Sequence, residues 1–269
     1  MNKDFFVGWS GEAPKSYVSK GRMFFLGSLI AILLAGVLFV FNQSAYIDSR
    51  YEFGTLTEVT GQLVEEPVWG LRIEEEENIK TIPLIGFGKM GPEATLTKIM
   101  EKHDLRSGLT VTFRGTLAHY QGKTLMELTE MENSLVSVGE QVMLNRNIKE
   151  KGFQKLEGEI VDPKCFFGVM NPAYKAVHRS CAILCISGGI PPVLAIRENG
   201  KFVDYYFLNS SNKKALIEKI LHYVGVPVKV SGQVVIYDDW KSMIIDPTNL
   251  QIDMRQTSGH HQKTITMCY

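Results

Sequence analysis

Two stretches of this chain align with each other without gaps, and this internal similarity constrains the fold more than any other feature. Residues 108–128 (GLTVTFRGTLAHYQGKTLMEL) align with residues 225–245 (GVPVKVSGQVVIYDDWKSMII) at a constant offset of 117 positions. The notable identical pairs are Gly108 and Gly225, Gly115 and Gly232, Tyr120 and Tyr237, and Met126 and Met243. Both segments alternate apolar and polar residues around a short polar turn, which is typical of a half-buried β-hairpin. The chain is therefore expected to contain two copies of one β-rich unit.

The segments that precede each hairpin indicate which unit is repeated. Residues 60–67 (TGQLVEEP) resemble residues 157–163 (EGEIVDP) at an offset of 97. Each copy then has a further strand pattern (80–85 and 202–208) and a helix pattern (93–103 and 213–224) before its hairpin. Strand, strand, strand, helix and hairpin is the element order of an OB fold, a small five-stranded barrel. We predict a mainly β protein with two tandem OB-like barrels, residues 51–135 and 153–254. A polar linker around residues 145–152 would join them, and a polar tail, residues 255–269, would follow.

The second copy contains an insertion that gathers residues capable of binding a metal. The offset grows from 97 to 117, which places 20 extra residues between Pro163 and Pro192. The insertion carries the pattern C-x12-H-x2-C-x3-C, formed by Cys165, His178, Cys181 and Cys185. If residues 178–185 are helical, the last three ligands lie on one face, and Cys165 approaches from the preceding loop. Three thiolates and one imidazole form a tetrahedral zinc set. Because the first copy has no cysteine, the insertion is expected to be added to the barrel rather than to form part of its core.

Other interpretations of these four residues stay open. Buried cysteines often act as small apolar side chains. Cys165 is also able to form a disulfide with Cys181 or Cys185, which would leave one thiol unpaired. An iron–sulfur cluster or redox-active thiols would use the same residues. A metal site with zinc is the favoured prediction, and an iron–sulfur cluster is the alternative cofactor.

The insertion also resembles a sequence motif of bacterial proteins. The segments GEIVDPKC (158–165), HRSCA (178–182) and CISGGIPP (185–192) are similar to G-E-[IV]-[VI]-D-x-x-C followed by H-x-x-C-A-x-x-C-I-x-x-G-x-P. This motif is found in uncharacterised exported or membrane-anchored bacterial proteins. The resemblance covers only a small part of the chain. It implies that the four residues act as a group, and it implies no particular activity.

The N-terminal part of the chain contains an apolar segment without a charge. Residues 23–41 (MFFLGSLIAILLAGVLFVF) would span about 28 Å as a helix, close to the thickness of a bilayer core. Lys3, Lys15, Lys20 and Arg22 precede it, whereas Arg50 is the only basic residue in the dozen that follow. The positive-inside rule then predicts a single-pass protein of the bacterial inner membrane, with residues 1–22 cytoplasmic and the bulk periplasmic. A cleaved signal peptide is the alternative, although Gln43 and Ala45 make a poor cleavage site.

The remaining patterns favour a binding role over catalysis. Lysine plus arginine equals aspartate plus glutamate, 29 each, so no nucleic-acid partner is expected. Residues 86–91 (GFGKMG) match G-x-G-x-x-G, but the following hairpin is antiparallel, so no nucleotide is expected. Serine, histidine and aspartate form no triad pattern, and an enzyme is not expected. We therefore expect an accessory or assembly subunit of an envelope complex. It would contact the bilayer through residues 23–41, and its partner would be another membrane or envelope protein. A redox or electron-transfer protein is the alternative.

Overall fold

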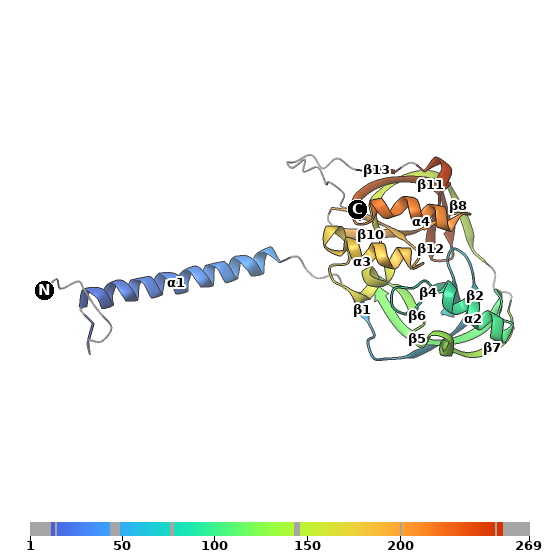
Figure 1. The fold of residues 1–269 in the computed structure, drawn as a ribbon, viewed down its shortest axis with the longest axis horizontal. Coiled ribbons are helices and arrows are strands. Elements are labelled where there is room, and N and C mark those ends of the chain that lie inside the picture. The colour runs from blue at the N-terminus through green and yellow to red at the C-terminus, as the bar shows by residue number, and fades with distance from the viewer. Residues whose placement is uncertain are drawn as a thin grey trace. The chain divides into compact units, whose positions relative to one another are not determined.

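The computed structural model describes residues 12–13, 15–43, 49–75, 78–142, 146–199, 201–250 and 252–254. Contacts divide the chain into two compact units, Met1–Tyr46 and Ile47–Tyr269. The predicted polar tail, residues 255–269, lies outside the described residues, as does the segment 1–11. Figure 1 shows the first unit as one long helix and the second as a mainly β body with short helices.

The first unit consists of α1 (Lys15–Asn42). Its apolar side chains are exposed on all faces, from Met23 through Phe41. A helix that is apolar all round requires an apolar environment. Its candidate span, Tyr17–Asn42, has 26 residues and is long and apolar enough to cross a membrane. The predicted apolar helix is thus confirmed.

The first half of the second unit is a seven-stranded sheet that closes on itself. The neighbour order is β1-β5-β2-β3-β4-β6, and β5 also pairs with β6. This extra pairing closes β2 to β6 into a five-stranded barrel, in which only β4 and β6 run parallel. β1 and β7 add to β5 outside the ring. The elements are β1 (Ser49–Tyr51), β2 (Thr57–Val64), β3 (Gly70–Glu75), β4 (Asn78–Ile85), α2 (Glu93–His103), β5 (Leu109–Tyr120), β6 (Lys123–Glu127), η1 (Met131–Ser134) and β7 (Leu135–Gln141).

The second half is a six-stranded sheet with the order β12-β10-β9-β8-β11-β13, in which β11 also pairs with β12. Here β10 and β12 are the parallel pair. The elements are β8 (Ile148–Val161), η2 (Cys165–Val169), α3 (Lys175–Ser187), β9 (Val193–Glu198), β10 (Lys201–Asn209), α4 (Lys213–Ile220), η3 (Leu221–Tyr223), β11 (Pro227–Tyr237), β12 (Trp240–Ile244), η4 (Pro247–Asn249) and β13 (Ile252–Met254). The predicted linker around residues 145–152 is therefore partly strand, because β8 begins at Ile148 and pairs with β11 from that residue onward.

A shared aromatic cluster joins the two halves, and the insertion supplies its centre. Phe166 and Phe167 are fully buried. Both rings contact Tyr120 of the first half and Tyr205 of the second, with centroids 5.0–5.9 Å apart. The turn η2 that carries them lies against β1, β5 and β6. The expectation that the insertion lies outside the core is wrong, because two of its aromatic residues fill the space between the sheets.

Candidate metal centre

The end of β8 and the turn after it position the first donors. Asp162 follows the last residue of β8, and its Oδ1 accepts a 2.9 Å hydrogen bond from the backbone N–H of Lys164. The chain then forms η2, one turn of π-helix, in which the N–H of Phe166 donates to the Asp162 carbonyl at 3.0 Å. Asp162 and Cys165 are both buried as a result. The sequence predicted Cys165 on a loop here and did not select Asp162.

Helix α3 supplies the other three predicted donors. Residues 175–187 are helical, which confirms the helix predicted around His178, Cys181 and Cys185. The helix ends at Ser187, and the N–H of Gly188 donates to the carbonyls of Leu184 and Cys185 at 3.0 and 3.1 Å. Gly189 then adopts a φ of +99°, which favours glycine. The helix therefore ends at the glycine pair Gly188–Gly189.

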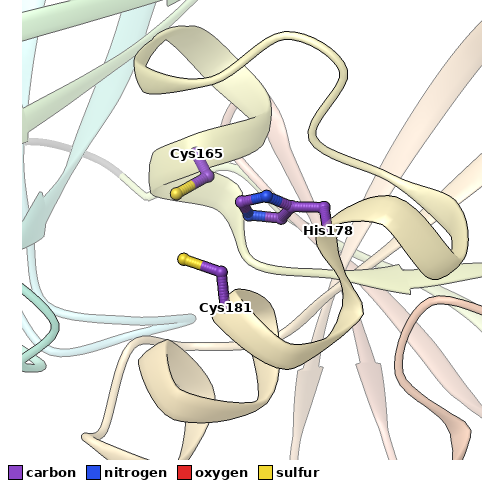
Figure 2. A group of neighbouring side chains, drawn as sticks. All are labelled: Cys165, His178 and Cys181. Atoms are coloured by element: carbon purple, nitrogen blue, oxygen red, sulfur yellow. The ribbon is translucent and has the colours of Figure 1, made fainter.

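The donor atoms form two overlapping groups. One ligand atom each from Cys165, His178 and Cys181 lie within 4.8 Å of one another. A second group, Asp162, Cys165 and Cys185, meets the same limit and shares Cys165. Figure 2 shows the sulfur atoms of Cys165 and Cys181 facing each other beside the His178 ring. The structure thus brings three of the four predicted ligands into one group, and it places Cys185 with Asp162 instead.

Two donor atoms in these groups lack a hydrogen-bond partner in the described part of the chain. They are Asp162 Oδ2 and His178 Nε2, and both are buried. His178 is 3 % exposed and Asp162 is 0 % exposed. Buried polar atoms are nearly always satisfied, and each unsatisfied atom costs about 1–3 kcal/mol. A cation bound by the first group would satisfy His178, and one bound by the second group would satisfy Asp162. Sulfur with imidazole or carboxylate is a donor set that suits zinc. The residues present therefore fit a metal ion.

Burial sets the protonation of the donors before any ion binds. The pKa of Cys165 is raised by its hydrogen bond to Cys185, by burial and by the charge of Asp162. Burial also raises the pKa of Cys181, although the charge of Lys89 opposes this shift. Burial lowers the pKa of His178 against the opposing charge of Asp162. The imidazole is therefore neutral and ready to bind, whereas the thiols of Cys165 and Cys181 are protonated, so metal binding releases protons. The three cysteines are free thiols in this structure.

The glycine-rich segment 86–91 packs against the end of α3. The N–H of Gly91 donates to the carbonyl of Gly188 at 2.8 Å. A Cβ on Gly91 would lie 2.2 Å from the Gly189 carbonyl oxygen, and one on Gly188 would lie 1.9 Å from that of Lys89. These glycines therefore permit two backbones to touch beside the candidate metal centre, and this contact accounts for Gly91, the last glycine of the G-x-G-x-x-G pattern.

A buried polar network next to Cys165 was not predicted. Lys164 Nζ lies 2.5 Å from Glu127 Oε1, and their side chains are 8 % and 6 % exposed. Lys164 also donates to the Gly88 carbonyl at 2.6 Å, and Glu127 accepts from the hydroxyl of Tyr51. Glu127 lies on β6, so this network ties the insertion to the first half. In the sequence, these residues are isolated charges more than 35 positions apart, which gives no local signal.

Comparisons of the chain with protein-family models, with curated proteins and with solved structures found no match.

Proposed function

We propose that this protein is a membrane-anchored metal-binding subunit of the bacterial envelope, with zinc as the ion. The observation that carries the proposal is the pair of buried, unpartnered atoms Asp162 Oδ2 and His178 Nε2 beside the cysteine thiols. When bound, zinc would be held by Cys165 and Cys181 with His178, or by Cys165 and Cys185 with Asp162, and would fix the insertion against the sheets. The role is that of a non-catalytic accessory or assembly protein, whose partner is another membrane or envelope protein.

We further propose that the two halves are a duplicated OB-like barrel. Equivalent glycines support this. A Cβ on Gly115 would meet the Glu127 carbonyl and the Met126 side chain, and a Cβ on Gly232 would meet the Ile244 carbonyl and the Met243 side chain. Each of these contacts keeps the offset of 117 seen in the sequence. The strand pairings also agree, since each half has one parallel pair at the position expected for such a barrel.

The redox alternative rests on the cysteines alone. Cys165 is hydrogen-bonded to Cys185, and its sulfur also lies within 4.8 Å of a donor atom of Cys181. The sulfur atoms of Cys181 and Cys185 thus lie near that of Cys165, and three neighbouring sulfurs would suit an iron–sulfur cluster or thiol exchange. Colour separates the two proposals, because a cluster absorbs visible light and a zinc site does not.

The deciding experiment measures metal in the purified full-length protein. About one zinc per chain is expected in the wild type, with a loss of most of that zinc in Cys165→Ser and in His178→Ala. Cys268→Ser is the matched control, since Cys268 lies outside the described residues and outside the predicted motif, and it should retain its zinc. A wild-type protein without metal would contradict the proposal, and iron with visible absorption would favour the alternative.

A further inference from the structure

A cavity of about 990 Å³ opens beside the metal centre. All three cysteines of the centre line it. Its other walls are mostly apolar and come from both halves; they include Phe53, Leu56, Phe87, Val169 and Met170. Phe53 is 90 % exposed and Phe87 is 50 % exposed. The cavity therefore joins an exposed apolar rim to the cysteine side of the donor groups, and its volume is in the range of small-molecule sites.

The charges that line the cavity leave one excess cation. Glu127 and Lys164 both line it, but they form a buried ion pair with each other. Lys89 lines the same cavity and is exposed. Among the described residues, Lys89 has no hydrogen-bond or ion-pair partner. An anion in the cavity would therefore be attracted by Lys89.

The metal-donor residues give a second reason to expect a small-molecule ligand in this cavity. The group of Cys165, His178 and Cys181 offers three protein donors, one fewer than a closed tetrahedral zinc site. Two of these three residues line the cavity. An ion held by this group would be accessible from the cavity. A fourth ligand could reach the ion from the cavity without replacing any of the three protein ligands.

We propose that the cavity binds a small apolar carboxylate, whose charged group lies between Lys89 and the metal centre. Its apolar part would lie against Phe53, Phe87 and Met170. This inference rests on the proposed metal site, and it extends that site from a structural role to ligand recognition.

The test uses the full-length chain in lipid nanodiscs, loaded with cobalt(II) in place of zinc, because cobalt reports its ligands through its visible spectrum. The probe is 3-phenylpropanoate. We expect a saturable change in the cobalt spectrum with this probe. The amide 3-phenylpropanamide and the cation 3-phenylpropylamine have the same shape, and they should bind at least tenfold more weakly. Lys89→Ala should lower the affinity for the carboxylate about three- to fivefold, the effect expected for one solvated ion pair. Lys151→Ala removes an exposed lysine of β8 and should leave the affinity unchanged.

The outcomes separate this inference from the proposed function. A chain that binds no cobalt would contradict the metal site itself. A chain that binds cobalt, but whose spectrum does not respond to the carboxylate, would overturn the cavity proposal and leave the metal site intact. Equal affinities for the carboxylate and the amine, or an unchanged affinity in Lys89→Ala, would overturn it as well.

Discussion

Asp162 is the donor that the predicted ligand set lacked. Its carboxylate is fully buried, and only Oδ1 has a hydrogen-bond partner in the described part of the chain. The sequence contained a signal for it, because Asp162 lies three residues before Cys165 within the segment that resembles the bacterial motif. A single aspartate after a strand is nevertheless too common to select, and its proximity to Cys185 depends on how α3 packs against the end of β8.

We predict that Asp162→Asn lowers the affinity for zinc about 10- to 100-fold, because it removes a charge that either binds the ion or orients its ligands. Competition with a chelator of known affinity measures this effect. Asp104→Asn is the control, since Asp104 is exposed at the end of α2. Equal zinc affinities in wild type and Asp162→Asn would show that this carboxylate has no part in the site.

A second residue-scale prediction concerns Glu159, which is 7 % exposed on β8. Burial raises its pKa, while the backbone N–H and the charge of Lys175 oppose the shift. With a folded pKa above the unfolded value of about 4.3, the contribution of Glu159 to stability is complete below pH 4.3 and is lost as the pH rises through the folded pKa. Glu159→Gln should therefore raise the free energy of unfolding near pH 7, by about 1 kcal/mol or less, and give no gain near pH 4. Urea denaturation at both pH values tests this, with the exposed Glu198→Gln as control; a gain that is equal at both would contradict it.

At the scale of elements, sequence periodicity predicted more than local patterns did. The hairpins β5–β6 and β11–β12 and the helices α2 and α3 lie where alternation or ligand spacing placed them. The burial of Phe166 and Phe167 was not predictable, because it depends on the space between two sheets that are distant in sequence. The role of Gly91 was hidden for the same reason, since its contact with Gly188 joins residues 97 positions apart.

The close approach at the end of α3 gives an element-scale prediction. Gly188 has an ordinary φ of −77°, so alanine there is unfavourable only because its Cβ would meet the Lys89 carbonyl oxygen at 1.9 Å. Gly188→Ala should lower the free energy of unfolding by about 1–3 kcal/mol and weaken zinc binding, because α3 must move away from segment 86–91. Gly139→Ala on β7 is the control, since its nearest contact would be an ordinary 3.5 Å. Similar stabilities of the two variants in urea would contradict the tight contact.

At the scale of the molecule, the two repeats form one compact unit rather than two separate domains. Arg72 of β3 forms a two-pronged ion pair with Asp238, at 2.7 and 3.0 Å, with side chains 1 % and 3 % exposed. Trp240 donates its ring N–H to the carbonyl of Thr81 at 2.7 Å. The turn between β11 and β12 is thereby fixed to β3 and β4. The sequence predicted two units from the repeat, but it could not show that they share buried charges and an aromatic cluster.

We therefore predict that the two halves unfold together. Arg72→Ala leaves Asp238 buried without its main partner and should cost about 3–5 kcal/mol. Hydrogen exchange in increasing urea should show amides of β5 and β11 losing protection at the same concentration, and Arg72→Ala should shift both by the same amount. Arg106→Ala removes an exposed arginine and should shift neither. Loss of protection in one half alone would show that the halves are independent.

The last prediction concerns how the whole chain lies in the cell. The helix α1 is long and apolar enough to span a bilayer, and its first turns carry the basic residues Lys15, Lys20 and Arg22, ahead of the uncharged segment 23–41. Because basic flanks remain in the cytoplasm, we expect the N-terminus inside and residues 45–269 in the periplasm. An alkaline phosphatase fused after Tyr269 should be active, and a cytoplasmic reporter at the same position should not be. Exchanging the charges, with Lys15, Lys20 and Arg22 changed to serine and three lysines added after residue 42, should reduce the phosphatase activity, because the bias that orients the helix is then reversed. An active cytoplasmic reporter on the unaltered chain would show that the chain has the opposite orientation. A mature protein that begins near residue 45 would instead show that α1 is a cleaved signal sequence, and the periplasmic unit would then be free of the membrane.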